Sequence, residues 1–161
     1  MIIYDIHGNK LLEIEGDTLR GAKLCNVNLK RANLKGLDLT GIRLKDSDLS
    51  YADMENAIFR RASITRCNLK KVNARNADFI DACIIRSNVR KADFRGANLK
   101  YTFFTDSDLR GVNIIGSNFK LTSVIGSDIR GLKIRNKSNI SGIFKKMYNL
   151  LFNKTIMRND G

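Results

Sequence analysis

The chain has 161 residues, about the length of one domain, and its 29 Lys and Arg against 16 Asp and Glu give a net charge of +13. No apolar run approaches the ~20 residues of a transmembrane helix, and the first ten residues lack the basic segment and apolar core of a secretory signal. The cysteines, Cys25, Cys67 and Cys83, are odd in number and follow no metal-binding spacing. This usage is typical of a reduced, cytoplasmic protein.

Residues 2–15 alternate between apolar and polar side chains around a His-Gly-Asn segment at 7–9. Two such runs joined by a short Gly-containing segment are typical of a β-hairpin. Because this segment directly precedes a repeat array, we expect residues 1–16 to cap the N-terminal end of the core. His7 is the only histidine and lies at the predicted turn, and no neighbouring motif gives it a catalytic or metal-binding partner.

From 17 to 136 an apolar residue returns at every fifth position. These central residues are Leu19, Leu24, Leu29, Leu34, Leu39, Leu44, Leu49, Met54, Phe59, Ile64, Leu69, Ala74, Phe79, Ile84, Val89, Phe94, Leu99, Phe104, Leu109, Ile114, Phe119, Val124, Ile129 and Ile134. Two positions before each stands a mostly small residue, such as Ala32, Ala92 or Ser107, and a polar residue, often Asn or Asp, lies between the two.

A period of five fits neither regular element. Five residues advance a side chain by about 500° on a helix, and on a strand an odd period alternates faces. Only a chain that turns a corner once per repeat keeps every central residue inside. Four right-angled corners close a square, so one coil takes about 20 residues and coils stack at roughly 4.8 Å. The central and the small residue then point inward, and the other three point outward.

The pattern Ala-(Asn/Asp)-Leu-X-X resembles the pentapeptide-repeat family. It occurs as Ala-Asn-Leu-Lys-Gly at 32–36, Ala-Asp-Phe-Arg-Gly at 92–96 and Ala-Asn-Leu-Lys-Tyr at 97–101. The resemblance covers 17–136 and implies an all-β solenoid, a right-handed quadrilateral β-helix of about six coils. Central residues 20 positions apart should stack as internal ladders, so the rings of Phe59 and Phe79 should lie one above the other.

After 136 the period of five is lost. Apolar residues between 140 and 157 recur at spacings of three to four, as in an amphipathic helix. We therefore expect residues 137–161 to form a C-terminal α-helix that caps the last coil. Its apolar excess also allows a homodimer contact, for which the candidates are Ile143, Phe144, Met147, Leu150 and Leu151.

The sequence contains no catalytic constellation, and we expect no catalytic, metal-binding or cofactor-binding residues. Its many Asp and Asn residues occupy the repeat position that precedes the central residue. The Gly-Ser-Asn and Gly-Ser-Asp segments at 116–118 and 126–128 are likewise repeat positions rather than phosphate-binding loops.

The positive charge gathers on one predicted wall. A stripe for an anionic partner would consist of Lys30, Arg31, Lys70, Lys71, Arg90, Lys91, Arg110 and Arg130. The alternative is that these residues only keep the surface soluble. Exposed aromatic residues are sparse, with Tyr51 and Tyr101 at outward corners, so base stacking receives little support.

A second group of outward positions is apolar. The predicted contact face consists of Ile80, Cys83, Ile85, Phe103, Leu121 and Ile125. A stacked apolar group on a surface favours a covered interface. The C-terminal segment or a second chain could cover it, and homodimerisation is slightly favoured.

These features favour a non-enzymatic binding or scaffold protein that presents flat faces to a protein partner. The alternative is weak, non-specific binding of nucleic acid, or of another anionic surface, through the basic stripe. Some members of the family resemble duplex DNA and bind type II topoisomerases such as gyrase. That role requires an acidic surface, so the net charge of +13 argues against it. An enzyme is the class least favoured.

Overall fold

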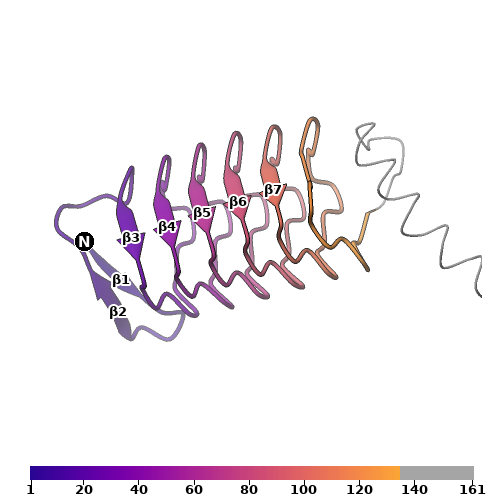
Figure 1. Cartoon of the computed structure of the whole chain (residues 1–161). Coiled ribbons are helices and arrows are strands. Elements are labelled where there is room, and N and C mark those ends of the chain that lie inside the picture. The colour runs from indigo at the N-terminus through magenta and orange to yellow at the C-terminus, as the bar shows by residue number, and fades with distance from the viewer. Residues whose placement is uncertain (135–161) are drawn as a thin grey trace, which may run out of the picture.

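A computed structural model describes residues 1–134, which form a β-solenoid with a hairpin at its N-terminal end (Figure 1). Its strands are β3 (Lys23–Cys25), β4 (Arg43–Lys45), β5 (Ser63–Thr65), β6 (Cys83–Ile85) and β7 (Phe103–Thr105). They form one parallel sheet in the order β3-β4-β5-β6-β7. Each strand pairs with the strand 20 residues on, as in Leu24 with Leu44. The predicted solenoid with a 20-residue coil is thus confirmed.

The other three sides of each coil are held by isolated parallel bridges, again 20 residues apart. Examples are Asn28 with Asp48, Asn33 with Asp53, and Asp38 with Ile58. The coil therefore has four walls. We name them by their central residues: the first wall contains Leu39, the second contains the β3–β7 sheet, the third contains Leu49 and the fourth contains Met54.

A tight turn separates the walls and explains the period of five. At three of the four corners, the carbonyl of the central residue accepts a hydrogen bond from the N–H three residues on, as in Leu29 O from Ala32 N at 3.0 Å. The residue two positions after the central one has a positive φ in every repeat from Gly21 to Gly131, between 49° and 75°. One left-handed residue per repeat thus turns the chain by one corner.

The corner between the second and third walls is built differently in all but the last coil, where Ser127 N donates to Val124 O at 3.1 Å as at the other corners. In earlier coils the free backbone N–H donates to a serine hydroxyl one coil further on, as from Ser87 N to Ser107 Oγ at 3.1 Å and from Ser107 N to Ser127 Oγ at 3.0 Å. Val27 and Cys67 use Ser47 and Ser87 in the same way. From the repeat pattern alone these inward serines are expected only to be small residues. The structure corrects this, because the hydroxyl satisfies a buried donor that the turn leaves unpaired.

The core is a continuous apolar column made of the central and small residues. The rings of Phe59 and Phe79 stack at 4.8 Å with an interplanar angle of 2°, as predicted. Phe94 packs edge-on against Phe79, with ring centroids 5.3 Å apart. Each coil is too thin to enclose a core, so stability comes from the contact between successive coils.

The predicted N-terminal hairpin is confirmed as antiparallel strands β1 (Ile2–Tyr4) and β2 (Lys10–Glu13). Ile3 is buried in the core cluster. The hairpin also pairs with the first coil, because Asn33 N donates to Tyr4 O at 2.8 Å and Ile6 N donates to Arg31 O at 2.9 Å. It therefore covers both the end of the core and an open backbone edge.

The predicted C-terminal helix, with Ile143, Phe144, Met147, Leu150 and Leu151, lies outside the described residues. Within residues 1–134 the structure has no helix long and apolar enough to cross a bilayer.

Candidate binding surfaces

The Asn or Asp before each central residue has a structural task. Its Oδ1 accepts a hydrogen bond from the backbone N–H two residues on, as in Lys70 N to Asn68 at 3.2 Å and Arg110 N to Asp108 at 3.1 Å. This local bond is the Asx turn, which an amide and a carboxylate support equally well. Exchanging Asn for Asp at this position therefore leaves the turn intact, but it changes the charge of the surface.

Where the residue is Asp, a neighbouring arginine pairs with it at five of the seven positions within residues 1–134, the exceptions being Asp48 and Asp53. Arg110 and Arg130 bind the aspartates two positions earlier, Asp108 and Asp128, at 2.6 Å each. Other arginines reach the aspartate 18 positions on, in the next coil, as Arg60 does with Asp78 at 2.6 Å. Both geometries follow from the repeat, because these positions adjoin across the stacked coils.

The predicted basic stripe divides into a half whose cations form ion pairs and a half whose cations do not. In its C-terminal half, Arg90 and Arg110 reach Asp108 and Asp128 in the next coil at 3.8 and 3.5 Å. The hydrogen bond from Arg110 lowers the pKa of Asp108, and that from Arg130 lowers the pKa of Asp128. Three arginines alternate with two carboxylates here, so most of the positive charge is neutralised.

The other five cations of the stripe form no ion pair with any residue in 1–134. They are Lys30, Arg31, Lys70, Lys71 and Lys91. Uncharged Asn28, Asn68 and Asn88 occupy three of the four positions on this part of the wall where a carboxylate could bind them. The fourth residue, Asp48, forms no ion pair within residues 1–134. Tyr51 lies among the five cations with 39% of its surface exposed, and the Lys71 ammonium lies 5.3 Å from the centre of its ring. We call these five cations and Tyr51 the basic corner.

Four residues of the basic corner occupy the left-handed position of the turn. The φ angles are 59° for Arg31, 62° for Tyr51, 58° for Lys71 and 57° for Lys91. A side chain with a Cβ costs roughly 1–2 kcal/mol in this conformation. The positions can be recognised in the sequence as the second residue after each central one, but their strain cannot be seen without the backbone.

The predicted apolar face is only partly exposed. Phe103, Leu121 and Ile125 are exposed by 48%, 59% and 59%, whereas Ile80, Cys83 and Ile85 are half-buried. Ile85 lies between Thr65 and Thr105 of the neighbouring strands, which cover its flanks. Tyr101, exposed by 38%, precedes strand β7 at the corner. We call Tyr101, Phe103, Leu121 and Ile125 the apolar patch.

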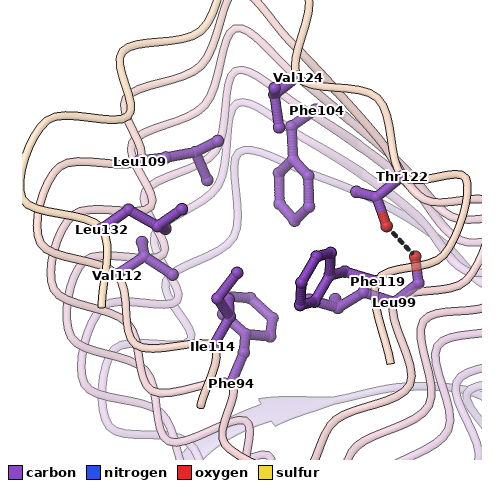
Figure 2. Close-up of a pocket in the computed structure, with 10 residues that line it drawn as sticks. All are labelled: Phe94, Leu99, Phe104, Leu109, Val112, Ile114, Phe119, Thr122, Val124 and Leu132. Atoms are coloured by element: carbon purple, nitrogen blue, oxygen red, sulfur yellow. Dashed lines mark hydrogen bonds between the residues drawn. The ribbon is translucent and has the colours of Figure 1, made fainter. Parts of the chain in front are cut away.

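A small cavity lies in the core near the C-terminal end of the described residues (Figure 2). The cavity, of about 20 Å³, is lined by Phe94, Leu99, Phe104, Leu109, Val112, Ile114, Phe119, Thr122, Val124 and Leu132. The Thr122 hydroxyl donates to the Leu99 carbonyl at 2.7 Å, so its hydrogen is already used (Figure 2). The lining offers no acid, base or nucleophile to a substrate, and we assign the cavity to the core.

The cysteines and the histidine do not assemble into a site. Cys67 is buried, Cys83 is half-buried and Cys25 is exposed, and all three are free thiols. Burial raises the pKa of the Cys67 thiol, which disfavours its reactive thiolate form. His7 lies exposed in the hairpin turn, where its backbone N–H donates to Asp5 Oδ1 at 2.8 Å. Residues 1–134 contain no cluster of three or more His, Cys, Asp or Glu that could hold a metal ion.

Comparison with known proteins gives one family. The model for pentapeptide repeats matches in eight copies, over residues 18–50, 38–73, 57–96 and 87–124. A search of curated protein sequences gave no significant match.

Solved structures of similar fold also consist of pentapeptide repeats. HetL, which is involved in heterocyst differentiation regulation in the cyanobacterium Nostoc sp. strain PCC 7120, is 22% identical over 70% of this chain and 59% of its own, with a TM-score of 0.42. Rfr23 from the cyanobacterium Cyanothece 51142 is 25% identical over 71% and 60%, with a TM-score of 0.31. The chain thus spans about 60% of either length. Full-length QnrB1, a plasmid-mediated fluoroquinolone resistance protein, is 17% identical over 84% and 88%, with a TM-score of 0.30.

Proposed function

The chain belongs to the pentapeptide-repeat family, and from this premise we propose that it is a non-enzymatic binding protein that presents a solenoid wall to a protein partner. The observation that supports this function is the apolar patch. Tyr101, Phe103, Leu121 and Ile125 are all exposed on walls whose outward positions are otherwise mostly polar. Covering such a group releases about 25 cal/mol for each Å² of apolar surface removed from water.

The partner that fits best is a second copy of this chain. Unpaired charges of both signs border the patch: Asp81 on one side, and Lys100 and Lys120 on the other, have no ion pair within residues 1–134. In a two-fold symmetric contact the same surface meets itself, so a mixed rim can place each cation opposite an anion of the other copy. Residues 137–161, which follow at this end, add the apolar side chains predicted to take part in a dimer.

Light scattering of the full chain tests this function. We expect the wild type to have the mass of a dimer, and Leu121→Asp/Ile125→Asp to have the mass of a monomer with an unchanged far-ultraviolet spectrum. The matched control is Arg61→Asp/Thr65→Asp, which places two carboxylates at the equivalent positions three coils earlier and should remain a dimer. A wild type that is monomeric at all concentrations would refute the proposal. Raised dye binding by that monomer after removal of 137–161 would assign the patch to the chain's own C-terminal segment.

Duplex mimicry is not proposed. Residues 1–134 alone contain 23 Lys and Arg against 15 Asp and Glu. A surface that imitates a chain of phosphates requires the opposite sign.

A further inference from the structure

The basic corner retains positive charge that the fold could have neutralised. Asn and Asp support the turn equally, and in the last coils of this wall Asp108 and Asp128 neutralise the arginines. In the earlier coils Asn28, Asn68 and Asn88 offer the cations no carboxylate, and Asp48, the one aspartate at this position there, forms no ion pair within residues 1–134. Lys23, Arg43 and Lys45 also lack an ion pair within residues 1–134, but they lie on strands β3 and β4 and surround no exposed ring. Lys100 lies 4.7 Å from the centre of the exposed Tyr101 ring, but there Phe103, Leu121 and Ile125 make the surrounding surface apolar.

The same coils hold side chains at positions that suit glycine. Arg31, Tyr51, Lys71 and Lys91 adopt positive φ, and the next two positions in this column are Gly111 and Gly131 with φ of 70° and 69°. Glycine is therefore compatible with this corner. The last side chain in this column before the glycines is Lys91, and the arginines of the wall become ion-paired from Arg90 onward. The change to glycine and the change to paired charge therefore occur at the same coil. Side chains hold the same conformation at the other corners, as Arg61, Asp81 and Arg86 do. The evidence for a role outside the fold is therefore the unpaired charge of this corner, and the glycines show only that the fold does not require its side chains.

Sparse exposed aromatic residues argue against base stacking over the surface as a whole, but Tyr51 lies exposed among the unpaired cations and indicates which kind of anion this corner binds. Backbone hydrogen bonds join the corner residues of successive coils, from Arg31 N to Ser50 O at 2.9 Å and from Tyr51 N to Lys70 O at 3.0 Å. The exposed ring is thus one level from cations on either side. Cations beside an exposed aromatic ring are the arrangement that binds single-stranded nucleic acid, because the cations contact phosphates while the ring stacks on a base. A duplex keeps its bases stacked inside, and an acidic polysaccharide has no planar ring to offer.

We propose that the basic corner binds single-stranded nucleic acid, with Lys30, Arg31, Lys70, Lys71 and Lys91 contacting phosphates and Tyr51 stacking on a base. DNA and RNA share this chemistry. Contacts to phosphates and stacking on a base face read no base edge, so binding is independent of sequence. The surface lies diagonally across the solenoid from the apolar patch, which lies at the corner between the first and second walls. This inference is therefore independent of the proposed dimer.

Fluorescence anisotropy with the full chain and labelled oligo-dT or oligo-rU provides the first test. Each phosphate contact on a single strand contributes about −0.7 to the slope of log K against log salt. The variant Lys71→Gly/Lys91→Gly should lower the affinity roughly tenfold at low salt and make the slope shallower by about 1.4. The matched control, Arg61→Gly/Arg86→Gly, removes the same charge at equivalent left-handed corner positions and should lower the affinity less than about twofold.

Tyr51 is tested separately with Tyr51→Leu and Tyr51→Phe. Loss of the ring should weaken binding of both oligonucleotides roughly fivefold or more without changing the salt slope, and phenylalanine should restore it. Heparin, a polyanion without bases, should bind Tyr51→Leu as well as it binds the wild type. A difference in affinity between oligo-dT and oligo-rU would show whether the corner prefers DNA or RNA. Either preference would support the inference.

Three results would overturn the inference. Equal losses in the two double-glycine variants would show that only total charge matters. Tighter binding of duplex DNA than of single strands would contradict stacking on a base. Unchanged affinity of Tyr51→Leu for the oligonucleotides would also contradict it. Because glycine suits both sets of corner positions, misfolding cannot explain a loss in one variant alone, and thermal melting of each variant verifies this.

Discussion

Two neighbouring corners of the solenoid have the same backbone and opposite surfaces. The corner after the third wall contains Arg31, Tyr51, Lys71 and Lys91, whereas the corner after the fourth contains Gly36, Asn56, Asn76, Gly96 and Gly116. All of these residues have φ between 56° and 75°. The turn hydrogen bonds are also alike, at 3.0 Å from Ala32 N to Leu29 O and at 3.2 Å from Leu37 N to Leu34 O. The backbone therefore specifies the conformation of a corner, and the outward side chain is free to serve another purpose.

Substitutions of the inward small residues should destabilise the protein to a similar extent at the two corners. Ala92 follows Lys91 and Ala97 follows Gly96, and both alanines are fully buried. Replacing either with leucine overpacks the column and should cost roughly 1–3 kcal/mol of unfolding free energy. Urea denaturation measures the cost. Ala22→Leu, at a half-buried small position of the first coil, is the control and should cost less. An unchanged midpoint for both variants would contradict the inward assignment.

Substitutions of outward residues should have unequal effects on stability, as at two glycines of the corner after the fourth wall. A Cβ on Gly96 would lie 2.2 Å from Asn76 Oδ1, whereas on Gly36, at nearly the same φ, it would meet nothing within 4 Å. Both Gly→Ala variants incur the left-handed strain of roughly 1–2 kcal/mol. Gly96→Ala should be the more destabilising, because Asn76 must also move. Equal melting temperatures would show that Asn76 gives way at no cost.

At the basic corner the opposite substitution should be tolerated. Lys91→Gly relieves the left-handed strain, and the greater entropy of glycine in the unfolded chain offsets roughly 0.5–1 kcal/mol of that gain. We expect its unfolding free energy to be unchanged or higher by up to about 1 kcal/mol. Urea denaturation of Lys71→Gly and Lys91→Gly checks this. A loss of stability would mean that the side chains support the fold.

The two halves of the basic stripe should differ in their response to acid. The pKa values of Asp108 and Asp128 are lowered, principally by hydrogen bonds from Arg110 and Arg130. A lowered folded-state pKa gives stability that is present above the unfolded value and lost as the pH falls through the folded value. This contribution should therefore disappear below about pH 4. Asp108→Asn keeps the turn and should reduce the acid dependence of the melting temperature. An identical pH profile would contradict the assignment.

The smallest effect on stability should come from Asn68→Asp. The carboxylate keeps the acceptor for Lys70 N and gives the Lys70 ammonium a partner, as Asp108 does for Arg110. An exposed pair of this kind contributes about 0–1 kcal/mol. Nucleic-acid binding should nevertheless weaken, because one cation becomes neutralised. Unchanged binding would exclude Lys70 from the surface.

The sequence predicted the fold because its period is a property of the whole array. Leu19 to Ile134 recur without a slip, and only a chain with a corner in each repeat can bury all of them. The N-terminal hairpin was likewise predicted from its alternation and its Gly-containing turn. The serine hydroxyls at 87, 107 and 127 were missed, because a buried serine and a buried alanine fit the same small position. Their role depends on an unpaired N–H one coil away.

The candidate surfaces were predicted only in outline. All eight stripe residues are on the predicted wall and its corner, but the division into a neutralised and an unpaired half depends on contacts across coils, such as Arg110 with Asp128. The apolar face was predicted as six residues, of which Phe103, Leu121 and Ile125 are exposed. Exposure depends on the side chains above and below in the stack.

Which residues face the core and how many residues make one coil can be read from the amino-acid order, because both follow from the repeat position, and the outward positions that carry charge can be read from the residues there. Which cations are paired, which corners are strained and which apolar residues are exposed depends on the stacked coils. These properties depend on neighbours 18 to 23 residues away, as in Arg60 with Asp78 and Thr122 with Leu99. Stacking of the coils brings such residues into contact. The repeat specifies that these positions adjoin, but it does not specify which residue types occupy them.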